Sequence, residues 1–242
     1  MLNKLLAPLG LTVNRRPEPD REFEARYKEQ LAVVRSEAEN TFVCEYPIND
    51  TGAHPRSYQD YECEFAAKHI SDRVPREILD IGSYRHFILG MLSHYPVTTV
   101  DVRSREPISQ NETVLTCDAK ALPLPDDSFD AVVALCALEH FGLGRYGDEL
   151  DLEADYKALN EIKRVLRPNG LFIVSTTVTD FRPSIAFNAH RIYMRSQIRK
   201  MLSPLIMVDE RVFSMVEGCE SESITKVPGA WDVYCGCWRK EQ

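Results

Sequence analysis

Between residues 77 and 177 the sequence alternates short, almost wholly apolar runs with longer segments of helical periodicity. Apolar runs of this kind are typical of strands that are buried on both faces, and the helices between them supply the crossovers that parallel strands need. The pattern predicts an α/β, Rossmann-like fold with a mostly parallel, seven-stranded sheet and helices on both faces. The expected strands are 77–82, 98–102, 113–117, 130–138, 171–177, 205–213 and 231–238.

Helical segments are expected both between these strands and ahead of them. They are residues 21–39, 56–74, 85–94, 153–166 and 194–203. Because the first two precede the first strand, we expect an N-terminal helical extension over 1–74 and the Rossmann-like domain over 75–242. Gly170, in "RPNG", is placed to end the helix before the fifth strand. The long connection 214–230 is expected to form a surface flap.

The charge and hydropathy of the chain restrict its partners. A formal net charge of −8 argues against broad attraction to nucleic acid. No segment reaches the roughly 18 to 20 continuous apolar residues that span a bilayer. Residues 1–16 join a short apolar stretch to Lys4, Arg15 and Arg16 without a small-residue cleavage site, so no signal peptide is expected. A helix that packs on the domain or a partner is favoured there over weak membrane contact, and the oligomeric state stays open.

The cysteines indicate the redox environment. The chain has seven of them, an odd number without paired metal-type spacing, which is typical of reduced thiols in the cytoplasm. Cys235 and Cys237 would share a face of a strand, and we interpret them as buried thiols in preference to a metal or redox pair. No cluster of His, Cys and carboxylate residues has metal-ligand spacing, so we expect no metal.

Three aspartates fall at the ends of successive expected strands. In parallel sheets the ligand lies at the carboxyl ends of the strands, where the strand order reverses. Asp101 follows Asp80 by about 20 residues, the spacing of a carboxylate that holds ribose hydroxyls. Asp118 ends the third strand, where it could meet the exocyclic amine of adenine. Each alone is more often a helix cap or turn residue, but together they predict a nucleoside site.

The turn after the first strand, "ILDIGSYRHF" (78–87), departs from the glycine-rich dinucleotide pattern. Tyr84 and His86 stand where further glycines would let the backbone approach a pyrophosphate, which argues against NAD or FAD. S-adenosylmethionine has no phosphate and makes less demand for that approach. Gly82 can supply the tight turn, and Ser83 can hydrogen-bond the amino-acid tail.

Residues 77–177, with "ILDIGS", "VDV", "CDAKALPLPDDSFDAVVALCALEHFG" and "EIKRVLRPNGLFIVSTT", resemble the class I S-adenosylmethionine-dependent methyltransferases. The resemblance implies S-adenosyl-L-methionine as cofactor. It implies that Asp80, Gly82 and Ser83 lie at the methionine portion, Asp101 at the ribose, Asp118 and Ala119 at the adenine, and Cys136 and Ala137 near the sulfonium.

Two further stretches carry a narrower resemblance. "EHFGLGRYGDELD" (139–151) and "FNAHRIY" (187–193) are similar to signatures of a little-characterised branch of bacterial methyltransferase-like proteins. Proteins of this branch often resemble those encoded among glycan-assembly functions. The resemblance therefore implies a role in polysaccharide biosynthesis, with a small or glycan-type acceptor such as a sugar or sugar nucleotide.

The same two stretches supply the candidate acceptor residues. We expect His190 as the base that takes a proton from an acceptor hydroxyl, His140 as second choice, and Asp148 to orient either. The expected acceptor-binding residues are Arg145, Tyr146, Asn188 and Arg191, with the two arginines holding an anionic group. The structural alternatives are a turn in which Asp148 pairs with Arg145, and a buried histidine that ties the 187–193 segment to the sheet.

Three other functions compete with methyl transfer to a small acceptor. A cofactor-binding protein without catalysis, in a regulatory role, keeps the same donor site. A nicotinamide-dependent oxidoreductase is disfavoured by Tyr84. A nucleic-acid methyltransferase is disfavoured by the net charge and by "LCALEHF" where an Asn-Pro-Pro-Tyr type stretch would follow the fourth strand.

Overall fold

The computed structural model describes residues 20–38, 41–49 and 56–242. The chain divides into two compact units, Met1–Pro55 and Arg56–Gln242. The prediction made for residues 1–16 lies outside the described residues. No helix within the described ranges is long and apolar enough to cross a membrane.

The first unit contains helix α2 (Arg21–Glu37), as expected from its periodicity. Asp20 caps the helix, because its side chain accepts a hydrogen bond from the Phe23 backbone N–H at 3.0 Å. Arg35 pairs with Glu45 of the following segment. None of the helical residues is buried, so the helix is stabilised by caps and ion pairs more than by a core.

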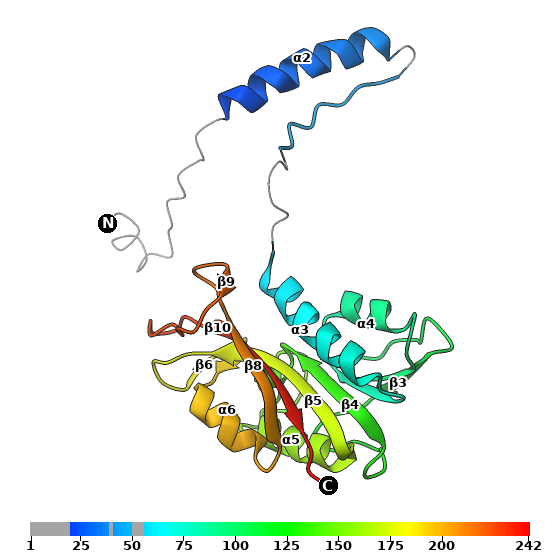
Figure 1. Ribbon diagram of the computed structural model, residues 1–242, viewed down its shortest axis with the longest axis vertical. Helices are drawn as coiled ribbons and strands as arrows, with labels where there is room; N and C mark the ends of the chain where they lie inside the picture. Colours follow the sequence, from blue (N-terminus) through cyan, green and yellow to red (C-terminus); the bar gives the residue numbers. More distant parts are fainter. Residues whose placement is uncertain (1–19, 39–40, 50–55) are drawn as a thin grey trace. The chain divides into compact units, whose positions relative to one another are not determined.

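The second unit is built on an eight-stranded sheet with the order β3-β2-β1-β4-β5-β10-β8-β9 (Figure 1). The first five strands run parallel, and β10, β8 and β9 are antiparallel to their neighbours. The strands are β1 (Ile78–Ile81), β2 (Val97–Asp101), β3 (Glu112–Thr116), β4 (Phe129–Leu135), β5 (Leu166–Val178), β8 (Ile206–Ser214), β9 (Cys219–Glu220) and β10 (Asp232–Arg239). This confirms the Rossmann-like fold.

The strand count differs from the expected seven because of β9. That strand has two residues, which pair with the end of β8 inside the expected flap 214–230. A separate hairpin of β6 (Ser184–Ala186) and β7 (His190–Ile192) was also not predicted. Strands of two or three residues are too short to show a periodic pattern.

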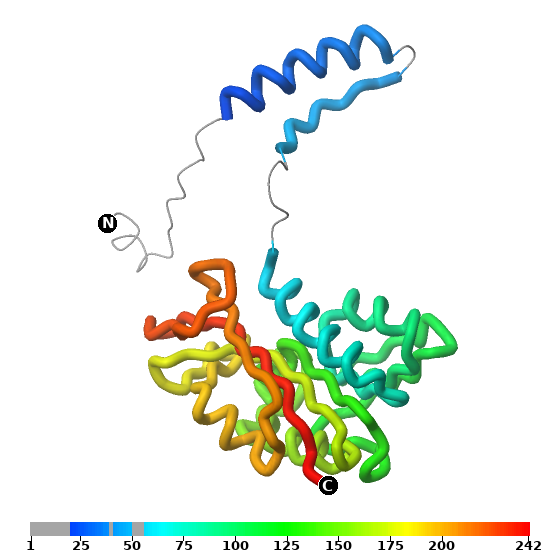
Figure 2. Tube along the Cα trace, in the orientation of Figure 1, coloured from blue at the N-terminus to red at the C-terminus, as the bar shows by residue number. Residues whose placement is uncertain are grey.

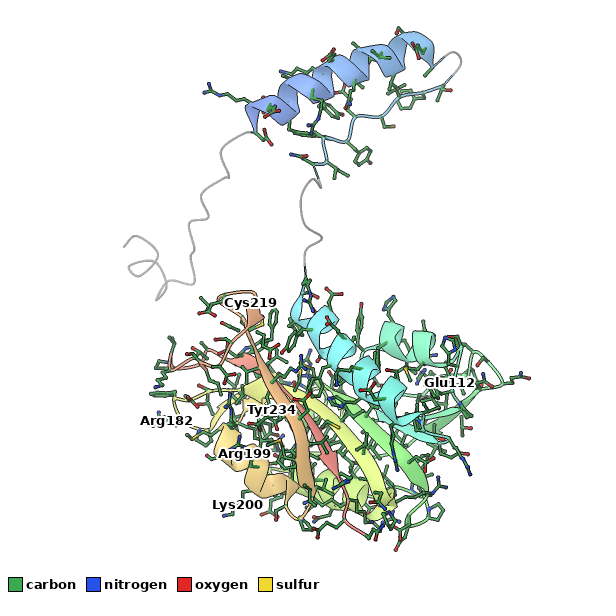
Figure 3. The ribbon with its side chains drawn as sticks, viewed as in Figure 1. Glu112, Arg182, Arg199, Lys200, Cys219 and Tyr234 are labelled. Atoms are coloured by element: carbon green, nitrogen blue, oxygen red, sulfur yellow. The ribbon has the colours of Figure 1, made fainter. Side chains whose placement is uncertain are left out.

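Helices cover both faces of the sheet (Figures 1 and 2). On one face, α3 (Tyr58–Arg73) and α4 (Arg85–Met91) pack on the strands through an apolar cluster that includes Phe65 and Ile88. On the other face, α5 (Ala154–Val165) and α6 (Arg195–Leu202) form a second cluster. Tyr234 of β10 is fully buried in this second cluster, and Figure 3 shows it over the middle of the sheet.

The compact unit begins at Arg56, ahead of the expected boundary at residue 75. A capping box formed by Ser57 and Asp60 starts α3, and Val74 ends it in the left-handed conformation at φ 49°. Phe65 and Ile70 of this helix are 4% and 2% exposed. Because α3 buries its apolar face on the sheet, it belongs to the domain and not to an extension.

The role expected of Gly170 is wrong. Helix α5 ends at Val165, and β5 already runs through the "RPNG" stretch. The residue with a positive φ is Asn169, at 63°. A Cβ on Gly170 would lie 2.8 Å from the Arg167 carbonyl oxygen, so glycine is needed there for close backbone approach.

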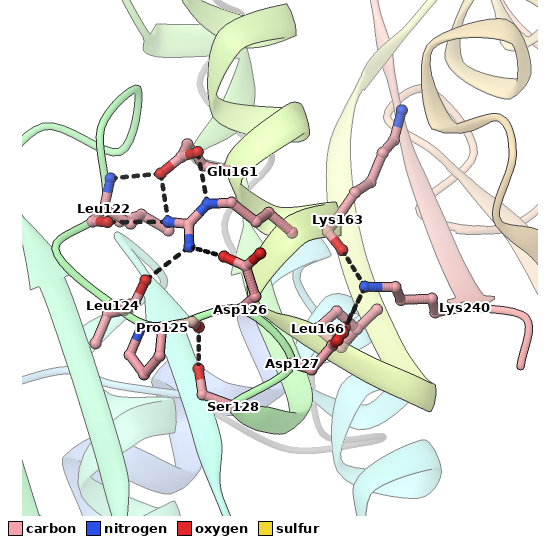
Figure 4. Close-up of polar contacts among 11 residues, drawn as sticks. Leu122, Leu124, Pro125, Asp126, Asp127, Ser128, Glu161, Lys163, Leu166 and Lys240 are labelled. Atoms are coloured by element: carbon pink, nitrogen blue, oxygen red, sulfur yellow. Dashed lines mark hydrogen bonds and ion pairs between the residues drawn. The ribbon is translucent and has the colours of Figure 1, made fainter.

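Two cationic side chains, Lys240 and Arg164, stabilise the edge of the domain opposite the carboxyl ends of the strands. Both donate hydrogen bonds to backbone carbonyl oxygens (Figure 4). Lys240 donates to the Lys163 and Leu166 carbonyl oxygens, at 2.8 and 2.7 Å, and to Asp127 at 2.8 Å. Arg164 donates to the carbonyls of Leu122 and Leu124.

Cys235 and Cys237, both on β10 of the sheet, are free and fully buried, as predicted.

Candidate functional site

A cleft opens at the carboxyl ends of β1, β2 and β4, where the strand order reverses. It encloses about 630 Å³ of empty space, its open mouth included, which lies within the usual range for small-molecule sites. Six of the eight predicted cofactor residues line it: Gly82, Asp101, Asp118, Ala119, Cys136 and Ala137. The other two, Asp80 and Ser83, line an adjoining cleft that shares Gly82 and Asp101 with the first.

Asp80 and Ser83 hold the turn between β1 and α4. Gly82 has φ 67°, a conformation that favours glycine. Ser83 donates its backbone N–H to Asp80 at 3.1 Å, and its hydroxyl accepts the Leu135 N–H at 3.0 Å. Asp80 is 3% exposed, and this burial raises its pKa to about 6. The hydrogen bonds therefore tie the turn to β4.

The tyrosine in this turn does not distort it. Tyr84 has φ −56°, which needs no glycine, and its ring lies 5.0 Å from that of His86.

Replacing Tyr84 and His86 with glycine should leave the Kd for S-adenosylhomocysteine within about twofold. It should lower stability by about 1 kcal/mol, since His86 lies in α4. Calorimetry and urea unfolding measure both, and clearly tighter binding would show a damaged glycine-rich turn instead.

Asp101 is fixed by Arg103, which the sequence analysis missed. The Arg103 Nε and Nη2 donate to the two carboxylate oxygens at 2.9 and 2.8 Å. Partial burial would raise the pKa of Asp101, but the hydrogen bonds and charge of Arg103 outweigh it and lower that pKa. An ionised carboxylate is the acceptor that ribose hydroxyls require. Arg103 also stacks on Tyr146, 4.7 Å from the ring centroid.

Replacing Asp101 by alanine should weaken S-adenosylhomocysteine binding by about 1.5 to 3 kcal/mol, the scale of hydrogen bonds to a charged group. Calorimetry on both proteins measures the difference. Asp127→Ala is a matched control, because Asp127 is an exposed aspartate that pairs with Lys240 and does not line the cleft. Equal affinities for wild type and Asp101→Ala would exclude this carboxylate from the site.

The "GLGRYGD" loop reaches the same cleft. Gly142 has φ 67°, and a Cβ there would lie 2.1 Å from the Asp151 carbonyl oxygen. Asp148 accepts the backbone N–H groups of Gly144 and Tyr146, at 3.3 and 3.0 Å. These bonds lower its pKa against the effect of burial. Asp148 therefore shapes the loop, as in the structural alternative to orienting a histidine, but through backbone N–H groups and not through a pair with Arg145.

His140, the second choice as base, lines the cleft. Its Nδ1 lies 2.6 Å from the Ala189 carbonyl oxygen. A carbonyl oxygen only accepts, so this contact favours a proton on Nδ1, while Arg145 Nη1, itself a donor, lies 3.3 Å from the same nitrogen. Burial lowers the pKa of His140, and the nearby Arg145 charge acts in the same direction, so the ring is neutral at pH 7.

His190, the first choice, does not line this cleft. Its ring centroid lies 6.3 Å from that of His140 and 5.6 Å from that of Trp231. Its Nε2 is buried without a hydrogen-bond partner among the described residues. Burial lowers its pKa as well. The geometry reverses the expected order, since His140 is the histidine in contact with the cleft.

Arg191, the predicted acceptor anchor, does not line the cleft. Arg191 is 5% exposed and donates to the carbonyl oxygens of Phe141, Asp151 and Leu152. Its Nε also lies 3.5 Å from Asp155. With its donors engaged inside the protein, it ties β7 to the loop that follows the "GLGRYGD" stretch.

Asn188 is exposed in the turn of the β6–β7 hairpin and does not line the cleft.

Several residues near the cleft escaped the sequence analysis. Tyr58 and Trp231 have ring centroids 6.0 Å apart, and Trp231 contacts His190. Two carboxyl groups, Glu62 and Glu139, are each 1% exposed. Burial raises the pKa of Glu139 to about 8. Only Glu139 could have been found from the sequence, because it is adjacent to His140; the others come from α3 and the last loop.

In the described part of the chain, no group of three or more potential ligands could hold a metal ion.

Comparisons with known sequences agree with this geometry. Residues 79–174 match the family described as "Methyltransferase domain". A malonyl-[acyl-carrier protein] O-methyltransferase from Halorhodospira halophila is 30% identical over 114 residues, 42% of this chain and 35% of the relative. A demethylmenaquinone methyltransferase from Thermus thermophilus is 30% identical over 117 residues, 43% and 48% of the two chains. The matches thus span less than half of either curated relative.

A solved structure agrees with the observed fold. The 1,6-didemethyltoxoflavin-N1-methyltransferase of Burkholderia thailandensis, bound to S-adenosylhomocysteine, superposes with a TM-score of 0.58 at 17% identity. The alignment covers 95% of this chain and 94% of that one. The chain therefore has the Rossmann-like fold of that solved methyltransferase, and residues 79–174 within it match a methyltransferase family.

Proposed function

We propose that this chain transfers the methyl group of S-adenosylmethionine to a hydroxyl oxygen of a small or glycan-type acceptor, with a sugar or sugar nucleotide as the favoured class. The observation that carries the proposal is that Asp101 and His140 line one cleft at the carboxyl ends of neighbouring strands. Asp101 offers an ionised carboxylate to a ribose, and His140 offers a neutral imidazole to an acceptor hydroxyl.

The residues on the donor side fit the cofactor. Gly82 leaves the backbone open beside Asp101, and Asp118 with Ala119 lines the same cleft where an adenine would lie. Cys136 and Ala137 supply small side chains at the end of β4. When bound, S-adenosylmethionine supplies an electrophilic methyl carbon on a sulfonium sulfur. The chain holds and orients that donor, and positioning of this kind accounts for a large part of the rate of a direct displacement.

On the acceptor side, His140 would remove the hydroxyl proton through Nε2 as the new carbon–oxygen bond forms. Tyr146 lines the cleft, with the Arg103 guanidinium over its ring. Arg145 is exposed next to it, with its guanidinium 5.3 Å from the Tyr146 ring centroid. An exposed guanidinium suits the phosphate of a sugar nucleotide or a sugar carboxylate. These features support a sugar nucleotide as the acceptor, with Arg145 as the remaining arginine that could bind its anionic group.

One observation favours a second candidate function. Arg103 already occupies both oxygens of Asp101, so ribose hydroxyls must share or displace that ion pair. A domain that binds the cofactor weakly, without catalysis, as part of a regulatory or partner-binding role would also show this arrangement.

Transfer of labelled methyl groups separates the candidates. The purified protein is incubated with methyl-labelled S-adenosylmethionine and a panel of sugar nucleotides and free sugars. Malonyl thioesters and quinone precursors are added because the two curated relatives are named for such acceptors. Label on a sugar supports the proposal, and label on a thioester or quinone only replaces its acceptor class. Cofactor binding without transfer to any acceptor favours the second candidate.

A further inference from the structure

Cys136 leaves β4 in a strained backbone conformation. Its φ is 45°, a value that residues other than glycine rarely adopt and that costs free energy. The residue lines the donor cleft, so the direction of its backbone decides the shape of the cleft wall at the end of β4. Surrounding contacts must hold this conformation in place.

The contacts that hold Cys136 come from Ser175 of β5. The Cys136 backbone N–H donates to the Ser175 hydroxyl oxygen at 2.8 Å and to the Ser175 carbonyl oxygen at 3.1 Å. The Cys136 sulfur lies 3.6 Å from the same hydroxyl oxygen. Ser175 is fully buried, so no solvent competes for these bonds.

The orientation of the Ser175 hydroxyl is set in turn by Glu62. The hydroxyl donates its single proton to the Glu62 carboxyl group, which leaves its lone pairs turned toward the Cys136 N–H. Glu62 lies on α3 and is 1% exposed. In the sequence it is N-terminal to residues 79–174, the segment that matches the family. A buried carboxyl group is costly unless it is hydrogen-bonded, and Glu62 is hydrogen-bonded to Ser175 and to the Cys136 thiol, both at the wall of the cleft.

We propose that Glu62 is a positioning residue for the donor cleft: through the Ser175 hydroxyl it holds Cys136 in the conformation that the bound cofactor requires. The inference rests on the proposed function, because it assumes that the cofactor binds against the end of β4. It gives α3 a part in cofactor binding, although the helix lines none of the cleft beside Cys136.

The test is S-adenosylhomocysteine binding to three variants, measured by calorimetry well below each melting temperature. Glu62→Ala should raise the Kd about tenfold or more, as strain at Cys136 relaxes. Glu62→Gln should keep the Kd within about twofold, because an amide oxygen still accepts from Ser175. His69→Ala is the matched control: His69 is also buried on α3, but it bonds Asp209 at 3.1 Å, on β8.

A double variant gives an independent readout. On the Ser175→Ala background, Glu62→Ala should change the Kd clearly less than it does in the wild type, because only the direct contact between the Glu62 carboxyl group and the Cys136 thiol is then left to lose. Additive effects would overturn the inference, and so would a Glu62→Ala protein that binds like wild type despite a lower melting temperature. If Glu62→Ala does not fold, Glu62→Gln and Ser175→Ala decide alone, with normal and weakened binding expected respectively. Failure of the wild type to bind would instead contradict the proposed function.

Discussion

Replacing Arg191 by alanine should lower the free energy of unfolding by about 3 to 5 kcal/mol, the cost of breaking a buried pair by removing one partner. Arg191 is 5% exposed, and its loss removes a hydrogen-bond donor from each of the carbonyl oxygens of Phe141, Asp151 and Leu152. Asp155, 1% exposed, would also lose the guanidinium that lies beside it. Urea denaturation measures the change.

Arg145→Ala is the matched control for this prediction. The sequence analysis gave Arg145 the same anchor role as Arg191. Its side chain, however, is exposed and donates to one backbone carbonyl, that of Ala189, at 3.3 Å. Its replacement should change stability by less than about 1 kcal/mol. An Arg191→Ala protein as stable as wild type, with a raised KM for an acceptor, would restore the anchor role first assigned to that residue.

Replacing His140 by alanine should lower turnover by about 10²- to 10⁴-fold, the range for loss of a positioned base. The Kd for S-adenosylhomocysteine should stay within about 1 kcal/mol of wild type, because the ring faces the acceptor side of the cleft in this account. Burial lowers the pKa of His140. The base is therefore neutral down to a pH below the ordinary histidine value of about 6.5, and the acid limb of the pH–rate profile should lie there.

His190→Ala separates the two histidines. His190 contacts His140 and Trp231 but does not line the cleft, so its loss should lower the melting temperature and reduce turnover less than His140→Ala does. Single-turnover rates with the labelled cofactor measure both variants. A larger loss for His190→Ala, at equal folded protein, would return the base assignment to His190.

The fold was predictable because its pattern is local. Strands β1 and β4 and the middle of β5 are mostly apolar runs, and the core helices have an apolar face of regular spacing, so neighbouring residues carry the signal. The assignment of α3 was not predictable in the same way. Its apolar face is visible in the sequence, but only the packing of Phe65 and Ile70 on the sheet shows that the helix belongs to the domain.

The donor side of the site was more predictable than the acceptor side for a related reason. Asp101 and Asp118 end successive parallel strands, and parallel topology brings those ends together whatever the loops do. Arg191 and His190 are neighbours on one short strand, and their surroundings differ because alternate residues of a strand face opposite sides. Glu62 meets Ser175 across 113 positions of the chain, a contact that leaves no local pattern.

Native mass spectrometry with an equimolar mixture of S-adenosylhomocysteine and NAD tests the central claim most directly. The account predicts one S-adenosylhomocysteine per chain and no NAD adduct, since Asp101 offers a carboxylate to ribose and the turn at Tyr84 is not built for a pyrophosphate. The Asp101→Ala protein should show a much smaller adduct at the same concentrations. An NAD adduct, or no adduct of either ligand with the folded wild-type protein, would contradict the assignment of this cleft to the methyl donor.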